Sequence, residues 1–158
     1  MSETLVTPEQ ISAVTRATNY GTWRVQKTWK PLTIVDAEGC WITDGAGKRY
    51  LDFSSQLMCS NLGHKNPHVV ESIARQAREL AFVGPVYATE ARARLSEKLL
   101  EVLPAGLEKF FFTTSGTDAN EAAFKIARMV TGKNKIISRY RSYHGSTAGS
   151  IAATGDPR

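Results

Sequence analysis

The stretch KFFFTTSGTDANEAAFKIARMVTG occupies residues 109–132 and decides the fold class. Its almost continuous apolar run at 110–113 is typical of a strand buried on both faces of a sheet. After the polar turn at 114–117, apolar residues recur at helical spacing as far as Gly132, which predicts a helix that ends there. A second strand is predicted at 135–138. Strand, glycine turn, helix and strand make a βαβ unit, so we expect an α/β fold with parallel strands.

Upstream of this unit, the sequence predicts a small antiparallel sheet and three helices. Short β-prone runs separated by glycine-containing turns fill residues 32–53. A helix is expected at 8–18 with Thr7 as its N-cap, and a second one begins at the Asn-Pro pair of residues 66–67. The third helix has its apolar face at Leu95, Leu99, Val102 and Leu103.

Composition bounds the class of protein. The chain has 158 residues, about the size of one domain. Its 20 basic and 15 acidic residues give a formal charge of +5, but the two signs are interspersed and no aromatic-basic recognition motif occurs. We therefore expect no nucleic-acid partner.

The chain carries few signs of secretion or membrane insertion. Cys40 and Cys59 are too few for a disulfide framework, so we expect both to be small buried hydrophobic residues in a reducing compartment. No apolar run approaches the ~20 residues of a membrane span, and the N-terminus lacks the pattern of a secretory leader. The expectation is a cytoplasmic protein with no membrane partner.

The turn at Ser115-Gly116-Thr117 is the first candidate site. It lies where a strand becomes a helix, and there the backbone N–H groups and the positive helix end can bind a phosphate. The spacing fits neither a P-loop nor a dinucleotide fingerprint. The structural alternative is an ordinary N-cap, because Ser and Thr are favoured there for helix stability alone.

A second candidate lies in the loop Tyr143-His144-Gly145, which follows the second predicted strand. Loops after strand ends line the ligand crevice of a doubly wound sheet. Tyr143 and His144 offer a stacking face and a polar contact to a flat ring, although such a triplet is also common in ordinary loops. Together the two loops suggest a phosphorylated aromatic cofactor.

The spacing of His64, His68 and Glu71 suggests a metal site, but none is expected. Pro67 places the first imidazole outside the helix, and Zn²⁺ needs a third and often a fourth ligand.

Four motifs in order resemble those of the class III aminotransferases, the ω-aminotransferase branch of the fold type I pyridoxal-phosphate enzymes. Residues 112–123 resemble the phosphate cup of that family, and residues 143–147 resemble its ring-stacking loop. Residues 39–52 and the sequence NLGHKNP at 61–67 are similar to its N-terminal sheet and to the helix start that follows. The resemblance extends from about residue 32 to the end of the chain.

The resemblance implies roles for particular residues. The backbone amides of Gly116 and Thr117 bind the phosphate of pyridoxal phosphate, with help from the hydroxyl of Ser115 or Thr117. The ring of Tyr143 stacks on the pyridine, and His144 lies beside that contact.

The resemblance also implies where substrate is bound. Leu57 and Met58, just after the third N-terminal strand, are candidates, together with Trp23 near the family's aromatic segment. Here the chain departs from the family, because residues 54–59 read SSQLMC where relatives commonly have Ser-Gly or Ala-Gly. The family's aromatic-Pro-aromatic-Thr segment is missing as well, so the substrate stays open.

Transamination needs a lysine that bonds to the cofactor and a carboxylate that protonates the pyridine nitrogen. In the family both lie well after the Tyr-His-Gly loop, and in this chain no lysine follows Lys135. We therefore expect the N-terminal fragment of a homodimeric class III aminotransferase, inactive by itself. The whole enzyme would move an amino group from an amine or ω-amino acid to pyruvate or 2-oxoglutarate.

The expected domains follow from the same resemblance. Residues 1–60 would contribute the small sheet to a small domain, and residues 61–158 would hold connecting helices and the truncated start of the cofactor-binding large domain. Two alternatives stay open: a non-catalytic dimerisation or interaction module, and an aminomutase, racemase or decarboxylase of the same fold.

Overall fold

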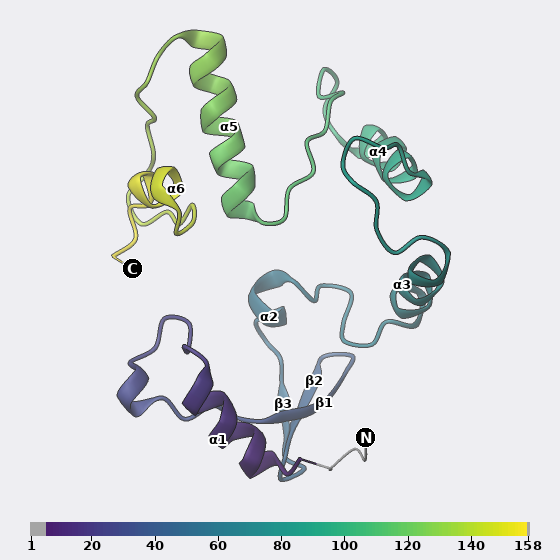
Figure 1. Ribbon diagram of the computed structural model, residues 1–158, viewed down its shortest axis with the longest axis vertical. Helices are drawn as coiled ribbons and strands as arrows, with labels where there is room; N and C mark the ends of the chain where they lie inside the picture. Colours follow the sequence, from purple (N-terminus) through teal and green to yellow (C-terminus); the bar gives the residue numbers. More distant parts are fainter. Residues whose placement is uncertain (1–5, 158) are drawn as a thin grey trace. The chain divides into compact units, whose positions relative to one another are not determined.

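The computed structural model describes residues 6–157 of a chain that divides into two compact units, Met1–Gly84 and Pro85–Arg158 (Figure 1). Both units combine helices with irregular segments, and the described part of the first also holds a sheet. The expected domain boundary after residue 60 concerns the whole enzyme, and it stays a prediction. The first unit contains α1 (Pro8–Thr18), η1 (Gln26–Thr28), β1 (Ile34–Glu38), β2 (Trp41–Asp44), β3 (Arg49–Leu51), α2 (Ser55–Met58) and α3 (Pro67–Glu79). The second contains α4 (Glu90–Val102), α5 (Gly116–Thr131) and α6 (Ala148–Ala153).

The three strands form one antiparallel sheet in the order β1-β2-β3, which confirms the predicted small sheet. The buried carboxylate of Asp44 closes the turn between β2 and β3. It accepts hydrogen bonds at 2.9 Å from the backbone N–H groups of Ala46 and Lys48 and one at 2.8 Å from the Tyr50 hydroxyl. Since these bonds satisfy a buried charge, Asp44 fixes the register of the hairpin.

Helix α1 begins as the sequence predicts. The Thr7 hydroxyl accepts from the N–H of Gln10, and the Gln10 side chain accepts in return from the N–H of Thr7, which makes a capping box. The Thr33 hydroxyl donates to the carbonyl of Pro8 at 2.9 Å and ties the start of α1 to the segment before β1.

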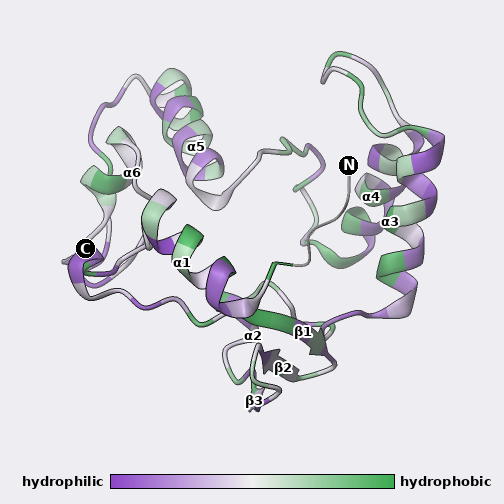
Figure 2. Cartoon of the chain, turned by 60° about the horizontal axis from the view of Figure 1, so that its bottom comes forward, coloured by the Kyte–Doolittle hydropathy of each residue, from purple (hydrophilic) through white to green (hydrophobic). Residues whose placement is uncertain are grey.

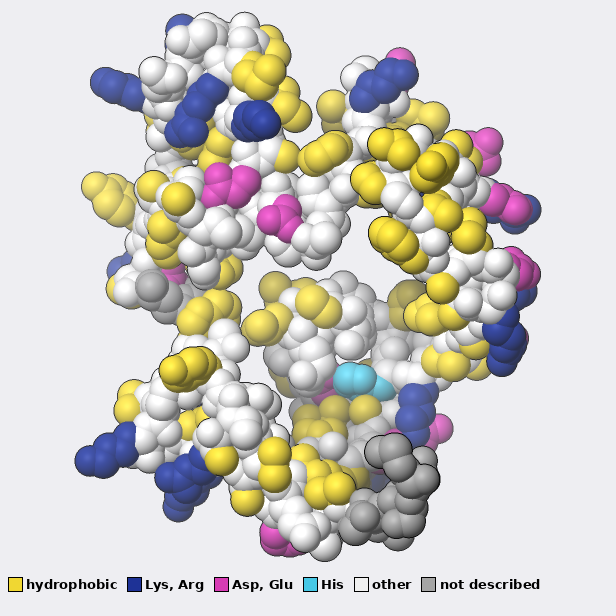
Figure 3. Space-filling view, viewed as in Figure 1, with side chains coloured by type: hydrophobic (Ala, Val, Ile, Leu, Met, Phe, Trp, Pro, Cys, Tyr) yellow, Lys and Arg dark blue, Asp and Glu magenta, His cyan; other side chains and the backbone are white. Residues whose placement is uncertain are grey.

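Helices α3 and α4 also confirm the predicted elements. The Asn66 side-chain oxygen accepts from the N–H groups of His68 and Val69 at 3.1 and 3.4 Å, and the Thr89 hydroxyl accepts from Arg92 N–H at 3.4 Å. Hydrophobic and hydrophilic residues alternate around both helices (Figure 2). Hydrophobic side chains gather over α3 and α4 on the visible face of the space-filling view (Figure 3), so their apolar faces are not covered there.

The two strands expected at 110–113 and 135–138 are not formed in the described chain, and that prediction is wrong. The backbone has no ladder at either segment. A strand exists only through hydrogen bonds to a neighbour, and residues 6–157 supply no such neighbour. The expected burial is absent for the same reason: Phe111 is 74% exposed and Ile137 is 97% exposed.

The expectation that both cysteines are buried is also wrong. Cys40 lies exposed at the turn between β1 and β2, and Cys59 lies exposed just after α2. Turns lie at the surface, where few other residues pack against a side chain. A small hydrophobic residue therefore stays accessible there.

Candidate functional site

The N-terminal end of α5 presents unused backbone donors. Ser115 is the N-cap: its hydroxyl oxygen accepts from Asp118 N–H at 3.2 Å, and its carbonyl accepts from Ala119 N–H at 3.0 Å. Within residues 6–157, no hydrogen bond uses the N–H of Gly116 or Thr117. A Cβ placed on Gly116 would meet nothing within 4 Å. The first turn of α5 thus offers two amide donors and open space to an anion.

The two predicted roles of Ser115, as helix N-cap and as phosphate ligand, are compatible. Its oxygen caps the helix, and a hydroxyl that accepts one hydrogen bond still has a proton to donate. The hydroxyl of Thr114 is hydrogen-bonded to the Asp118 carboxylate, which keeps that acidic group engaged beside the helix end.

The Tyr143-His144-Gly145 loop lies directly against this end of α5. The Asn120 side-chain amide donates to the His144 carbonyl at 2.7 Å. Gly145 is buried with φ of 140°, and a Cβ there would lie 2.5 Å from the Thr117 hydroxyl oxygen and 2.8 Å from the Ser150 Cβ. Only glycine allows this close approach.

Further hydrogen bonds fix the shape of the loop. The His144 N–H donates to the Thr154 hydroxyl at 3.0 Å, and that hydroxyl donates to the Ser150 carbonyl at 2.8 Å. The hydroxyls of Tyr143 and Ser146 are hydrogen-bonded to each other at 3.0 Å. The Tyr143 side chain stays partly exposed, so its ring can still stack on a ligand.

Glu121 on the second turn of α5 gathers the start of α6. Its Oε1 atom accepts from the Thr147 hydroxyl and, at 2.9 Å each, from the N–H groups of Gly149 and Ser150. These bonds, the one from Thr147 first, lower the pKa of the Glu121 carboxyl below its usual value. Ser150 is fully buried, and its hydroxyl donates to the Thr117 carbonyl at 3.3 Å. Helix α6 is therefore attached to the N-terminal end of α5.

The structure brings the predicted cofactor residues together. Gly116 and Thr117 lie at the start of α5 beside Ser115, while His144 reaches that helix through Asn120, and Tyr143 precedes it in the same loop. Residues 120, 121, 150 and 154, which hold the loop and α6 against α5, were not predicted from the sequence. The only sequence signal for Asn120 and Glu121 is that they form a polar pair inside an otherwise alanine-rich stripe.

Leu57 and Met58 lie in α2, which is a left-handed turn. All four residues of α2 have positive φ, from 47° at Ser55 to 64° at Met58. Such backbone costs about 1–2 kcal/mol per residue, and it persists only where other contacts hold it. Leu57 and Met58 are 66% and 73% exposed, so the turn presents both apolar side chains outward.

Asp52 supplies contacts that hold this turn. One of its carboxylate oxygens accepts from Gln56 N–H and from the Ser54 hydroxyl, each at 3.3 Å. The other lies 2.8 Å from His64 Nε2. The hydrogen bond with His64, and then those with Gln56 and Ser54, lower the pKa of Asp52. In the part of the chain that the structure describes, no cluster of three or more His, Cys, Asp or Glu side chains can hold a metal ion.

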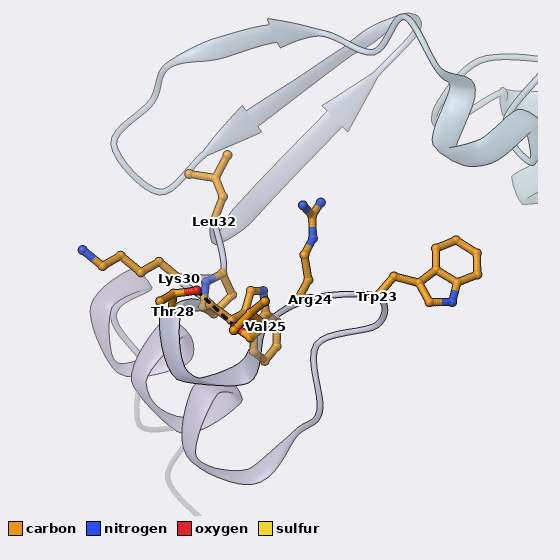
Figure 4. Close-up of a pocket in the computed structure, with 8 residues that line it drawn as sticks. Trp23, Arg24, Val25, Thr28, Lys30 and Leu32 are labelled. Atoms are coloured by element: carbon orange, nitrogen blue, oxygen red, sulfur yellow. Dashed lines mark hydrogen bonds between the residues drawn. The ribbon is translucent and has the colours of Figure 1, made fainter. Parts of the chain in front are cut away.

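Trp23 lines a pocket of about 690 Å³ in the first unit (Figure 4). The pocket lies between the loop after α1 and the segment before β1, and Leu57 and Met58 are not among its lining residues. In the close-up the Trp23 indole extends away from the other labelled side chains.

None of the helices among the described residues has the length and hydrophobicity of a membrane-spanning segment.

A family model described as aminotransferase class III matches residues 23–158. The chain belongs to the class III aminotransferase family. These enzymes use pyridoxal phosphate as cofactor, and the solved relatives have the fold type I architecture.

Individual relatives agree with this assignment. The chain is 42% identical over 139 residues to an acetylornithine aminotransferase of Mycolicibacterium smegmatis, which is 88% of this chain and 33% of that protein. A taurine:2-oxoglutarate aminotransferase of Bifidobacterium kashiwanohense, solved with pyridoxal phosphate and glutamate, superposes with a TM-score of 0.86 at 42% identity. That match covers 98% of this chain and 34% of the other.

A third relative is an (S)-enantioselective ω-transaminase of Thermomicrobium roseum. It superposes with a TM-score of 0.89 at 33% identity, covering 96% of this chain and 36% of the other. The chain thus spans about a third of the length of the aminotransferases that it matches.

Proposed function

We propose that this chain is the N-terminal part of an aminotransferase that moves an amino group from an amine or ω-amino acid to a 2-oxo acid such as pyruvate or 2-oxoglutarate. The observation that carries the proposal is the pair of unused amides at Gly116 and Thr117 next to the Tyr143-His144 loop. A phosphate on a flat ring fits this donor set. Pyridoxal phosphate, when bound, supplies an electron sink for bonds at the substrate amine carbon.

Each residue of the site has a task toward that cofactor. The amides of Gly116 and Thr117, with the hydroxyl of Ser115, bind the phosphate. The ring of Tyr143 stacks on the pyridine and keeps water from one of its faces, while His144 borders the same contact. Lys135 is the last lysine of the 158 residues. We therefore assign the lysine and the pyridine carboxylate to residues outside this chain, and expect the chain alone to be inactive.

Substrate and assembly complete the proposal. Leu57 and Met58, carried outward by α2, and Trp23 would contact the substrate. We propose a cytoplasmic homodimer, with the small domain starting in residues 1–60 and the large domain in residues 61–158. The names of relatives suggest acetylornithine and taurine as first donors to test, because both carry a primary amine at a distance from an anionic group.

The test uses protein expressed from the complete coding sequence and measures two half-reactions. Adding an amine donor should bleach the absorbance of the bound cofactor, and adding pyruvate or 2-oxoglutarate should restore it. Turnover of the amine with no oxo acid present and without bleaching would reject amino transfer and favour a mutase, racemase or decarboxylase. Bleaching that neither acid reverses would reject pyruvate and 2-oxoglutarate as acceptors. Unphosphorylated pyridoxal is the control, and it should bind far more weakly because the amides of Gly116 and Thr117 then have no anion to bind.

A further inference from the structure

The Glu121 side chain on α5 accepts three hydrogen bonds, and all three come from residues outside α5. Three donors from residues 147–150 converge on one of its oxygens, and two of these are backbone N–H groups. No side chain caps α6 at its own N-cap, Thr147. The carboxylate of Glu121 therefore takes the place of that cap from another helix.

The position of Glu121 couples this cap to the candidate cofactor site. It lies one turn after Thr117, whose carbonyl accepts from the buried Ser150 hydroxyl at 3.3 Å. Ser150 also carries one of the N–H groups that Glu121 accepts. The adjacent Asn120 holds the His144 carbonyl at 2.7 Å. Two consecutive residues of α5 thus hold both ends of the segment that runs from the aromatic loop into α6.

Packing allows little adjustment of this arrangement. A Cβ on Gly149 would lie 2.4 Å from Glu121 Oε2, and one on Gly145 would lie 2.5 Å from the Thr117 hydroxyl oxygen. A carboxylate bonded to N–H groups is also stronger than a neutral acceptor. Moving Glu121 would therefore move residues 145–150 relative to the start of α5.

We propose that Glu121 is a positioning residue for the bound cofactor: by capping α6 it sets the spacing between the phosphate-binding amides of α5 and the stacking ring of Tyr143. The inference rests on the proposed function, because it concerns how pyridoxal phosphate is held. The Glu121 side chain acts through its hydrogen bonds to Thr147, Gly149 and Ser150.

The test compares Glu121→Ala and Glu121→Gln with wild type, using protein expressed from the complete coding sequence. The first readout is amide hydrogen exchange without cofactor. Glu121→Ala should remove the protection of the Gly149 and Ser150 amides, whereas Glu121→Gln keeps an oxygen acceptor and should retain most of it. Glu97→Ala is the matched control, an exposed carboxylate on α4 with no hydrogen bond or ion pair among the described residues.

The second readout is the dissociation constant of pyridoxal phosphate together with the visible circular dichroism of the bound cofactor. Glu121→Ala should weaken binding by about tenfold, the loss expected for a charge-assisted hydrogen-bond network, and should change the circular dichroism band. Glu121→Gln should stay within about threefold of wild type, and Glu97→Ala should match wild type.

Unchanged exchange in Glu121→Ala overturns the cap, and lost protection with unchanged cofactor binding and dichroism reduces Glu121 to a structural role and overturns the inference. If wild type itself binds no pyridoxal phosphate, the proposed function fails, and the inference fails with it. Lost protection with weaker binding and rescue by glutamine supports it.

Discussion

Gly145 is the single residue on which the contact between the aromatic loop and α5 most depends. Gly145→Ala adds a methyl group 2.5 Å from the Thr117 hydroxyl oxygen at a φ of 140°. Backbone strain and overpacking each cost about 1–3 kcal/mol, so we expect a lower melting temperature and at least about tenfold weaker binding of pyridoxal phosphate. Thermal unfolding and cofactor titration measure the two effects.

The control for this substitution is Gly132→Ala at the end of α5. Gly132 also has positive φ, at 69°, but a Cβ there meets nothing within 4 Å. It should cost about 1 kcal/mol from backbone strain alone and leave cofactor affinity unchanged. Equal effects of the two alanines on cofactor binding would show that the contact with Thr117 does not matter.

Asp44 predicts a pH dependence of folding at the residue scale. Hydrogen bonds from Tyr50 first, and then from Lys48 and Ala46, lower the pKa of its carboxyl below the usual 3.8. A lowered folded-state pKa gives stabilisation that is complete above the unfolded pKa and is lost as pH falls through the folded one. Urea midpoints should therefore drop from pH 5 downward more steeply in wild type than in Asp44→Asn. Parallel curves for the two proteins would contradict this.

At the scale of elements, the cap of α3 is the best test of how sequence sets a boundary. Asn66 accepts from two N–H groups of the first turn, those of His68 and Val69. Asn66→Ala should lower the free energy of unfolding by about 1 kcal/mol, measured by urea denaturation. Asn66→Asp keeps the acceptor and places a negative charge at the positive helix end, so it should restore stability. If Asn66→Ala leaves the free energy of unfolding unchanged, α3 is held by its packing alone.

Elements governed by local signals could be predicted from the sequence. Caps at Thr7 and Asn66 and the left-handed Gly132 mark helix ends through contacts a few residues apart. The segments at 110–113 and 135–138 differ, because a strand depends on a partner that local pattern does not reveal. The left-handed turn of α2 has no glycine to announce it and relies on Asp52, whose contacts include the distant His64.

In the candidate site too, residues with local sequence signals could be predicted and residues with distant partners could not. Ser115, Gly116 and Thr117 were predictable because a helix start after an apolar run has a local signature. The role of Glu121 was not, since its partners lie 26 to 29 residues further along the chain. Contacts at that separation follow from how α6 packs on α5, and composition or periodicity carries no record of them.

At the scale of the whole molecule, the chain spans about a third of its relatives and leaves large apolar side chains uncovered. These include Phe111 and Ile137, which lie in the two segments without a strand partner. Unpaired backbone beside exposed apolar side chains promotes association between chains. The 158 residues taken alone therefore have surfaces that favour self-association.

This leads to a prediction for the 158-residue chain expressed by itself. Its sedimentation coefficient should rise with concentration between about 1 μM and about 100 μM, the range in which exposed strand edges aggregate. The double variant Phe111→Lys and Ile137→Lys should reduce the rise, because charge on an unpaired strand opposes pairing. Val14→Lys, which charges an exposed position of α1, should not. A chain that stays monomeric and unfolds cooperatively would instead favour an independent interaction module, since its apolar segments would then need no further strands to be stable.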